Sequence, residues 1–252
     1  MNLTNNAEKP LQGVVSLVTG GTKGWGLGIA DALKQAGAVV WVTGRDEAAV
    51  HQAQTVHGLQ GIAADVSKVE DWDRVVATIE KESGPIGILV NNAGAGGKIV
   101  PVGEQTDASI VDTIFTNLIG PMLGSRRIIP GMISRGDGVI VNISSACSFK
   151  SWPGWSIYSA AKAGLEQFAR GLYVELRPHG IRVSTIIPAW GATEFTKAAD
   201  LPGHPAGDPE IAKQCIQPSE MGQTVLNICT QPKHLAVLEL TLLPLVQEIC
   251  PL

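Results

Sequence analysis

The chain has 252 residues, 44% of them hydrophobic, and carries a net charge of −4 from 19 basic and 23 acidic side chains. No basic block stands out and no stretch reaches the ~20 apolar residues of a membrane span, so neither nucleic acid nor a membrane is expected as a partner. Four cysteines without paired or metal-like spacing, and an amino terminus unlike a signal peptide, predict a cytoplasmic protein with reduced thiols and no metal.

Strand-like and helix-like segments alternate along the chain. Short apolar runs beside glycine indicate strands, and apolar residues at every third or fourth position indicate helices. The expected elements, in chain order, are a strand at Val14–Thr19, a helix at Gly26–Gln35, a strand at Val39–Val42, a helix at Glu47–Val56, a strand at Leu59–Ala63, a helix at Lys68–Lys81, a strand at Gly87–Val90, a helical stretch from Asp107 to Ser134 with Pro121 as its candidate break, a strand at Gly138–Ile143, a helix at Ser156–Arg177, a strand at Ile181–Ile187, a loop with a short helix at 188–218, a helix at Glu220–Thr230 and a strand at Leu235–Leu240.

This alternation predicts an α/β fold in one domain spanning residues 1–252. Strands that each lead into a helix form parallel βαβ units, and right-handed crossovers place the helices on both faces of one sheet. Residues 1–12 precede the first strand and are expected to form an amino-terminal extension. Residues 189–215 are rich in glycine, proline and alanine, a composition typical of a mobile lid over a substrate site.

The turn after the first strand, residues 19–28, has the sequence TGGTKGWGLG. Small residues at this point let the backbone approach a pyrophosphate, and the helix that follows offers free N–H groups and the positive end of its dipole. A glycine-rich stretch can also be no more than a flexible turn. The strand–turn–helix context favours a dinucleotide site.

The end of the second strand bears on the choice of cofactor. A carboxylate there would accept a hydrogen bond from the adenosine ribose and repel a 2′-phosphate, whereas a cation would favour the phosphate. If Gly44 is the strand-end position, no acidic group is present there, and Arg45 and Lys23 could then both face the 2′-phosphate. This pattern favours NADP(H) over NAD(H), with a solvated Arg45 as the alternative. Asp46 is expected to cap the next helix.

Tyr158 and Lys162 lie four residues apart near the start of a predicted helix, which places both side chains on one helix face. A nearby ammonium group favours the phenolate and so lowers the pKa of a tyrosine from its ordinary value of about 10. Such a phenol can protonate the oxyanion formed by hydride attack on a carbonyl, or deprotonate an alcohol in reverse. Ser145 follows a strand and could hold the carbonyl oxygen. The Tyr–Lys spacing alone is common on helices, so other motifs must support this interpretation.

These motifs occur in an order that resembles the short-chain dehydrogenase/reductase family. The resemblance implies a Rossmann-type, doubly wound sheet of seven parallel strands and, from the long helices, a homotetramer or homodimer. The sequence departs from the family pattern at Ala189 and Ser148, where glycine is usual, and this leaves the shape of the substrate pocket open. The resemblance spans about Val14 to Thr193 and is carried by the glycine-rich turn, the run Asn91-Asn92-Ala93-Gly94, Asn117, Ser145, Tyr158 and Lys162.

The resemblance also implies roles for single residues. Tyr158 would be the acid/base, and Lys162 would bind the nicotinamide ribose and lower the pKa of Tyr158. Ser145 would position the substrate, with Ser144 as the less favoured candidate, and Asn117 would hold a water molecule linked to Lys162. The implied cofactor-binding residues are Gly20, Thr22, Lys23, Gly24, Trp25, Gly26, Arg45, Asp65, Val66, Asn92, Ala93, Gly94, Tyr158, Lys162, Pro188 and Thr193.

The substrate pocket is expected between residues 146–156 and the loop at 189–215. The tryptophan and phenylalanine residues of these two segments favour a pocket that binds apolar or aromatic groups. The tryptophans could instead pack the loop or a subunit contact. The predicted pocket residues are Ser145, Phe149, Trp152, Trp155, Trp190 and Phe195.

The sequence therefore predicts an NADPH-dependent carbonyl reductase, or ketoreductase, that converts a ketone or aldehyde reversibly to an alcohol. The second interpretation is an NAD-dependent alcohol or hydroxy-acid dehydrogenase, which uses the same reaction. A non-catalytic nucleotide-binding regulatory protein on the same fold is disfavoured, because the full set of Asn117, Ser145, Tyr158 and Lys162 is present. The short carboxyl-terminal region argues against an epimerase or dehydratase with an added substrate domain.

Overall fold

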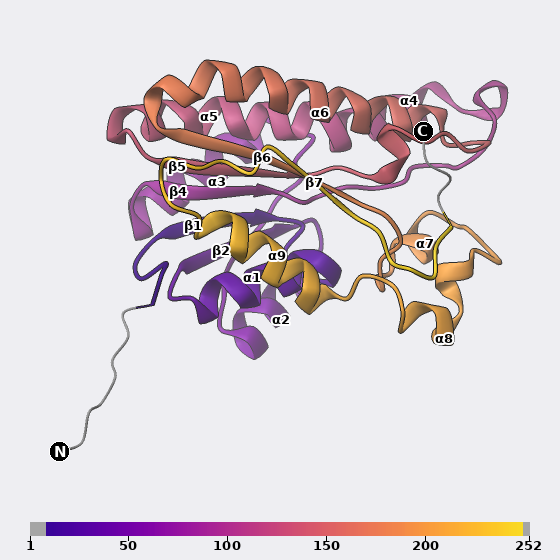
Figure 1. Cartoon of the computed structure of the whole chain (residues 1–252), viewed down its shortest axis with the longest axis horizontal. Helices are drawn as coiled ribbons and strands as arrows, with labels where there is room; N and C mark the ends of the chain where they lie inside the picture. The colour runs from indigo at the N-terminus through magenta and orange to yellow at the C-terminus, as the bar shows by residue number, and fades with distance from the viewer. Residues whose placement is uncertain (1–8, 249–252) are drawn as a thin grey trace.

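A computed structural model describes residues 9–248 and contains one parallel sheet of seven strands. The strands are β1 Val15–Thr19, β2 Val39–Gly44, β3 Gln60–Ala63, β4 Ile86–Asn91, β5 Gly138–Ile143, β6 Ile181–Pro188 and β7 Glu239–Leu242. Their order in the sheet is β3-β2-β1-β4-β5-β6-β7 (Figure 1). The chain builds outward from β1 to β3, crosses back to β4 and continues to β7, so the predicted doubly wound sheet is confirmed.

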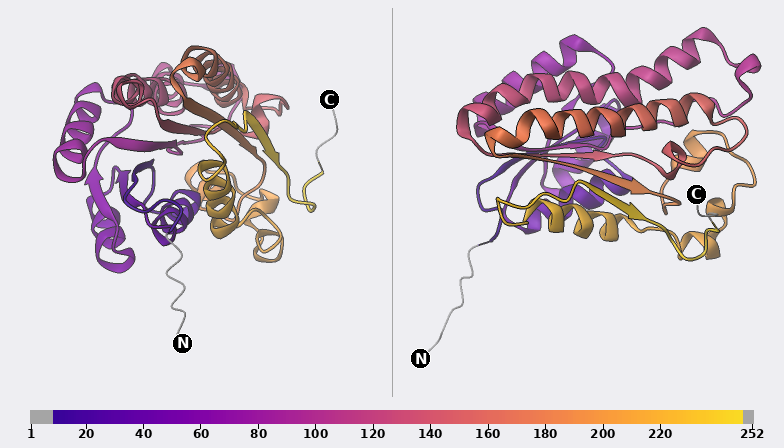
Figure 2. Two further views of the ribbon diagram at one scale, coloured as in Figure 1. Left: turned by 60° about the vertical axis from the view of Figure 1, so that its left-hand side comes forward. Right: turned by 45° about the horizontal axis from the view of Figure 1, so that its top comes forward.

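Helices cover both faces of the sheet, as right-handed crossovers require (Figure 2). They are α1 Gly24–Gln35, α2 Glu47–His57, α3 Val69–Ser83, α4 Asp107–Ile114, α5 Gly120–Arg135, α6 Ser156–Leu176, α7 Phe195–Ala198, α8 Pro209–Ala212 and α9 Pro218–Cys229. Helices α1, α2 and α9 lie on one face, and α3, α4, α5 and α6 lie on the other. The short helices α7 and α8 lie beyond the carboxyl ends of the strands, in the predicted lid segment.

The sheet separates two apolar cores. Ile29 of α1 and Met221 of α9 are fully buried against one face. Trp72 of α3, Ile128 of α5 and Leu172 of α6 are buried against the other. Because both faces are covered, every residue of β1 and β5 is buried, which explains why these strands are nearly continuous apolar runs.

The last strand lies further along the chain than the sequence predicted. It runs over Glu239–Leu242 instead of Leu235–Leu240, because its partner is the end of β6 at Thr185–Pro188. Leu235 and Leu238 are about half exposed and belong to the connection that leads into this register. Apolar composition alone therefore marked the strand four residues too early at its start.

The helical stretch that starts at Asp107 is not broken at Pro121. It continues to Arg135, and its irregularity is a π-helical turn over Phe115–Ile119, directly before α5. Pro121 is the second residue of α5, where a missing backbone N–H is tolerated. The π-helical turn contains Asn117, and such turns are frequent at functional sites.

Part of the predicted amino-terminal extension packs onto the fold. Leu11 is buried, and its backbone N–H donates to the carbonyl oxygen of Ala36 at 3.0 Å. Cys147, Cys215 and Cys229 are buried free thiols, as expected, while Cys250 lies outside the described residues. Within residues 9–248, no helix is long and apolar enough to cross a membrane and no cluster of potential metal ligands is found.

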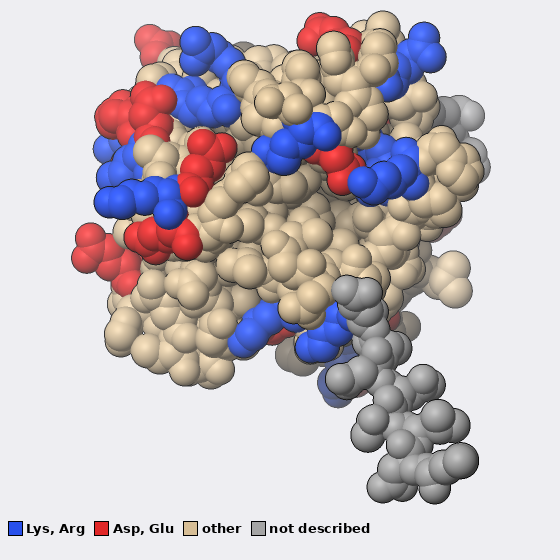
Figure 3. Space-filling model, turned by 90° about the vertical axis from the view of Figure 1, so that its left-hand side faces the viewer, with Lys and Arg blue, Asp and Glu red and all other residues tan. Residues whose placement is uncertain are grey.

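Acidic and basic side chains are mixed on the molecular face drawn in Figure 3. Lysine and arginine side chains lie next to aspartate and glutamate side chains, without a block of either sign. The ion pairs of the described residues fit this pattern; Arg127, for example, contacts Asp73 at 2.7 Å. On this face the surface therefore carries no field of one sign that would attract a nucleic acid.

Helices α1 and α9 approach each other closely because two glycines face the neighbouring backbone. A Cβ atom added to Gly28 would lie 2.0 Å from the carbonyl oxygen of Pro218. One added to Gly222 would lie 2.2 Å from the carbonyl oxygen of Gly28. Any side chain at either position would push α9 away from α1 and so disturb the helix that begins at the glycine-rich turn.

Gly28→Ala is expected to destabilise the protein by about 1–3 kcal/mol, because the added methyl group meets backbone atoms that cannot move independently. Gly171→Ala in α6 is the matched control, since a Cβ atom there meets nothing within 4 Å. It should stabilise the protein by about 0.5–1 kcal/mol through helix propensity. Urea denaturation of both variants would measure the two changes. Equal gains in stability would contradict the close helix contact.

Candidate active site

Two adjoining cavities open at the carboxyl edge of the sheet. The first, of about 440 Å³, lies over the ends of β1, β2, β3 and β4. The second, of about 360 Å³, lies over the ends of β5 and β6. Trp25, Thr193 and Phe195 line both. Ligands of open α/β sheets bind at this edge, beside the point where the strand order reverses, which here lies between β1 and β4.

The glycine-rich turn forms one wall of the first cavity and is tied to β4. The side chain of Asn92 donates to the carbonyl oxygens of Thr19 at 2.9 Å and Gly20 at 3.2 Å. A Cβ atom at Gly26 would lie 2.1 Å from the carbonyl oxygen of Gly20, so the turn closes this tightly only with glycine. No side chain caps the amino terminus of α1, whose first N–H groups therefore remain available to a ligand.

Strand β2 ends at Gly44, two residues beyond the predicted Val42, and Gly44 packs against Thr22. Asp46 caps α2 by accepting from the backbone N–H groups of Ala48 at 2.9 Å and Ala49 at 3.3 Å, which confirms the expected helix cap. Gly44 therefore brings no carboxylate to the strand end, and the Oδ1 atom of Asp46 is engaged in the helix cap.

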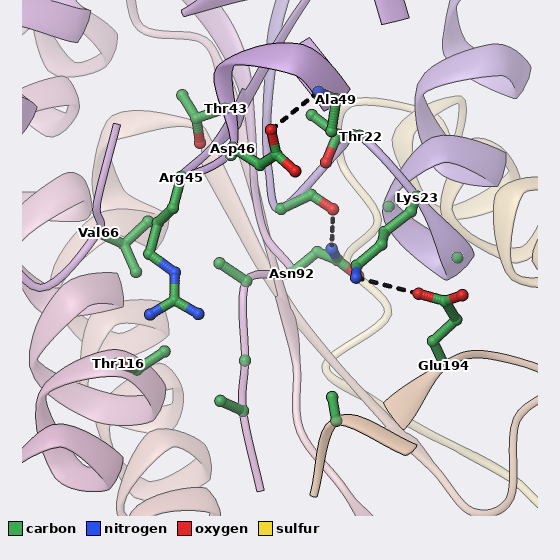
Figure 4. A pocket seen from close by; sticks show the side chains of 18 of the residues that line it. Thr22, Lys23, Thr43, Arg45, Asp46, Ala49, Val66, Asn92, Thr116 and Glu194 are labelled. Carbon is green, nitrogen blue, oxygen red and sulfur yellow. Dashed lines mark hydrogen bonds and ion pairs between the residues drawn. The ribbon is translucent and has the colours of Figure 1, made fainter. Parts of the chain in front are cut away.

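The two predicted phosphate-binding cations lie on different sides of the first cavity (Figure 4). Arg45 extends toward Val66, whereas Lys23 forms an exposed ion pair with Glu194 at 3.2 Å. The expectation that both face the same point is therefore only partly met, because Glu194 of the lid segment competes for Lys23. In the view of Figure 4, Arg45 extends past Val66 toward Thr116 and is drawn with no ion-pair partner.

The end of β3 supplies the remaining wall of the first cavity. Asp65 and Val66 both line it, as expected. The carboxylate of Asp65 accepts from the backbone N–H of Ser67 at 2.9 Å and from its hydroxyl at 2.8 Å. Asp65 therefore shapes the turn after β3 with its side chain.

Tyr158 lies in the first turn of α6 and is buried. Its ring centroid is 5.6 Å from that of Trp155 and 5.7 Å from that of Phe195. The Nζ atom of Lys162 is 5.6 Å from the same ring and donates to the carbonyl oxygen of Ile143 at 2.9 Å. The predicted Tyr–Lys pair thus lies on one face of α6, with the lysine tied to the end of β5.

The two serines after β5 have different surroundings. The Ser144 hydroxyl donates to the Oε1 atom of Glu166 at 2.7 Å, so it is engaged behind the cavity. The hydroxyl of Ser145 accepts from the backbone N–H of Cys147 at 3.2 Å and keeps its own hydrogen for another acceptor. This difference agrees with the preference for Ser145 over Ser144.

Asn117 is fully buried inside the π-helical turn. Its side chain donates to the carbonyl oxygens of Ala95 at 2.7 Å and Thr113 at 2.9 Å, and accepts from the N–H of Ala95 at 3.3 Å. A Cβ atom at Gly94 would lie 3.0 Å from Asn117 Oδ1 and 3.4 Å from Lys162 Nζ. Glycine at that position lets both side chains approach the same backbone.

Comparison with known proteins assigns this geometry to a family. The model of the short chain dehydrogenase family matches residues 14–202. The chain belongs to this family. It is 36% identical over 193 residues to dehydrogenase/reductase SDR family member 4 of Homo sapiens, which covers 75% of this chain and 69% of that protein.

Two further similarities extend over more of the chain. Carbonyl reductase family member 4 of Danio rerio is 34% identical over 221 residues, which are 86% of this chain and 92% of that protein. The closed form of serine dehydrogenase complexed with NADP+ superposes with a TM-score of 0.85 and 29% identity, covering 95% of this chain and 98% of that one. The protein is therefore an NAD(P)-dependent oxidoreductase.

The first cavity of this short-chain dehydrogenase fits a dinucleotide. Its glycine cradle, the free N–H groups of α1 and the Arg45 guanidinium are the groups that a pyrophosphate and an adenosine phosphate need. Of the predicted cofactor residues, all line this cavity except Tyr158, Pro188 and Lys162. Tyr158 and Pro188 line the second cavity, and Lys162 is buried next to it.

Burial dominates the ionisation of Tyr158 and Lys162. Desolvation raises the pKa of Tyr158 above its ordinary value, Cys147 acts in the same direction, and Ser145 acts against both. The lowering of the Tyr158 pKa expected from Lys162 is therefore not found, because desolvation of the buried phenol outweighs the influences that act against it. Desolvation also lowers the pKa of Lys162 to about 8, although Cys147 and Glu166 oppose the shift.

The second cavity contains five of the six predicted pocket residues. Ser145, Trp152, Trp155, Trp190 and Phe195 line it. Phe149 does not, because the 3₁₀ turn over Ala146–Ser148 presents Cys147 to the cavity instead. The prediction for Phe149 was wrong.

The second cavity also contains residues that the sequence did not reveal. Trp25 reaches it from the glycine-rich turn and His204 from the lid segment. Gln247 and Glu248 reach it from the carboxyl-terminal segment, and Gln247 Oε1 accepts from the backbone N–H of Trp190 at 2.8 Å. No local pattern marks these positions, because they become neighbours only when the chain folds.

The depressed pKa of Lys162 predicts a pH-dependent stability. Between pH 8 and 10.5 the folded protein releases this proton while the unfolded chain keeps it, so stability rises with pH. Lys162→Met removes the buried ammonium and should be more stable than the wild type at pH 7. This advantage should shrink between pH 8 and 10. Urea denaturation across that range tests it, and a constant difference would contradict the shift.

Proposed function

We propose that this short-chain dehydrogenase is an NADPH-dependent carbonyl reductase with Tyr158 as its acid/base. The observation that carries the proposal is the position of Tyr158. Its phenol lines the second cavity, and its ring contacts Phe195, which lines both cavities. A proton donor at this junction is next to both a nicotinamide held in the first cavity and a carbonyl held in the second.

Each residue of the set has a defined task in this proposal. A bound nicotinamide cofactor would supply the hydride that reaches the carbonyl carbon. Ser145 donates a hydrogen bond to the carbonyl oxygen, and Tyr158 donates the proton that completes the alcohol. Lys162, whose Nζ atom lies 5.6 Å from the phenol ring, would bind the nicotinamide ribose when the cofactor is present. Asn117 fixes the backbone at Ala95 beside this group, and its role in holding a water molecule stays a prediction.

The charge pattern at the end of β2 supports NADP(H) as the cofactor. Gly44 brings no carboxylate to the strand end, the Oδ1 atom of Asp46 caps its helix, and Arg45 lines the first cavity. The similar serine dehydrogenase, with a TM-score of 0.85, is complexed with NADP+, which agrees with this choice. A guanidinium can grip phosphate oxygens with two hydrogen bonds.

The second cavity favours reduction of a carbonyl compound over oxidation of a hydroxy acid. Among the described residues that line it there is no lysine or arginine to bind a carboxylate. A hydroxy-acid substrate would have to bury its charge without a partner, which is costly. A cytoplasmic location, a single domain with a mobile lid at 189–215, and assembly into a homotetramer or homodimer stay predictions.

Tyr158→Phe removes the proton donor while keeping the ring, so kcat for ketone reduction should fall by about 10²–10⁴-fold. Tyr173→Phe is the matched control, because Tyr173 lies on the same helix and is the other tyrosine of the chain. The measurement is NADPH oxidation with a panel of aryl ketones. Equal turnover by both variants would exclude Tyr158 as the acid/base.

Arg45→Ala removes the cation that would face the 2′-phosphate. The KM for NADPH should rise by about 10–100-fold, while that for NADH should change little, because only NADPH carries this group. Lys23→Ala should have a smaller effect, since Lys23 is paired with Glu194. Initial-rate kinetics with both cofactors provide the test. A wild-type preference for NADH would overturn the choice of cofactor.

A further inference from the structure

The second cavity has an unusually aromatic wall. Four of the six tryptophans of the chain line it, namely Trp25, Trp152, Trp155 and Trp190. Phe195 adds a fifth ring and stacks on Trp155, with centroids 6.3 Å apart and ring planes 16° apart. Aromatic faces are electron-rich, so a cavity built in this way attracts cations as well as apolar groups.

The other ionisable groups of this wall are neutral or acidic. His204 Nδ1 accepts from the backbone N–H of Ala206 at 3.2 Å, which requires that this nitrogen be unprotonated. Burial lowers the pKa of His204 and raises that of the Cys147 thiol, so neither brings a charge. Among the lining residues that the structure describes, Glu248 supplies a carboxylate and no lysine or arginine opposes it.

Glu248 is held at the cavity by its neighbour. The side chain of Gln247 is buried, and its Oε1 atom accepts from the backbone N–H of Trp190 at 2.8 Å. The backbone N–H of Gln247 donates to the carbonyl oxygen of Pro244 at 3.0 Å, which closes a turn. These two bonds fix the carboxyl-terminal segment against the aromatic wall and place Glu248 at the exposed rim beside it.

We propose that the second cavity selects carbonyl compounds that carry an ammonium group on an aryl or alkyl body and discriminates against carboxylates. This inference rests on the proposed carbonyl reductase function and assigns its substrate class. The tryptophan faces and Glu248 would receive the cationic group, while Tyr158 and Ser145 receive the carbonyl oxygen. A carboxylate at the same place would lose its water without gaining a partner.

The test uses three ketones that share a 4-acetylbenzyl body, of which the ammonium and neutral ones have nearly equal shape. These are 4-acetylbenzyltrimethylammonium, 4-neopentylacetophenone and 4-acetylphenylacetate, which differ in charge and share a methylene group that insulates the carbonyl. The expected order of kcat/KM with NADPH is ammonium, then neutral, then carboxylate. The ammonium ketone should exceed the neutral one by about 3–30-fold, the range expected for a cation on aromatic faces.

Glu248→Gln should reduce the ratio of kcat/KM between the ammonium and neutral ketones by about 1.5–5-fold, because one attractive charge at the exposed rim is lost. Glu210→Gln is the matched control. It changes the net charge equally and lies in the lid segment, but it does not line the cavity. It should leave the ratio unchanged, so an equal fall in both variants would point to the overall charge and contradict a site at Glu248.

Isothermal titration calorimetry of the same three ketones with the protein and NADP+ measures binding without turnover. It separates the proposed substrate class from the proposed carbonyl reductase function. An affinity order of ammonium, neutral and carboxylate supports the substrate class even if no ketone is reduced, in which case the carbonyl reductase function fails alone. Equal affinities, or tightest binding of the carboxylate, overturn the substrate class. Reduction of the neutral ketone would then still support the carbonyl reductase function.

Discussion

The hydroxyl group of Thr19 joins β1 to β4 at the point where the strand order reverses, and the whole site depends on this junction. It donates to the carbonyl oxygen of Val90 at 3.3 Å and accepts from the N–H groups of Asn92 at 3.1 Å and Ala93 at 3.0 Å. The side chain of Asn92 returns to the glycine-rich turn. These bonds join the turn after β1 to the segment after β4. They therefore fix one wall of the first cavity and the start of the chain segment that leads from β4 to Ala95, which Asn117 contacts.

A second link connects β5 to α6 and accounts for the buried charge. Lys162 donates to the carbonyl oxygen of Ile143, and the Ser144 hydroxyl contacts Glu166 one helical turn further along. A buried ammonium is unfavourable for the folded state, and burial accordingly lowers the pKa of Lys162. The hydrogen bond to the carbonyl oxygen of Ile143 offsets part of this unfavourable burial.

The second cavity is assembled from segments far apart in the chain. Trp25 leaves the glycine-rich turn, packs on Gly191, and donates from its indole N–H to the carbonyl oxygen of Ile216 at 3.1 Å. The lid segment is thereby tied to the first cavity, and Gln247 ties the carboxyl-terminal segment to Trp190. Changes in the lid should consequently affect the cofactor and the substrate together.

The sequence by itself determined the parallel α/β architecture, the glycine-rich turn, the cap at Asp46 and the spacing of Tyr158 and Lys162. These features depend on residues close together in the chain, where periodicity and turn chemistry act directly. Tertiary structure decided the register of β7, the π-helical turn at Asn117, the pairing of Lys23 with Glu194 and the exchange of Phe149 for Cys147 in the second cavity. It also decided the direction of the Tyr158 pKa, because desolvation depends on everything packed around a group and no local spacing records it.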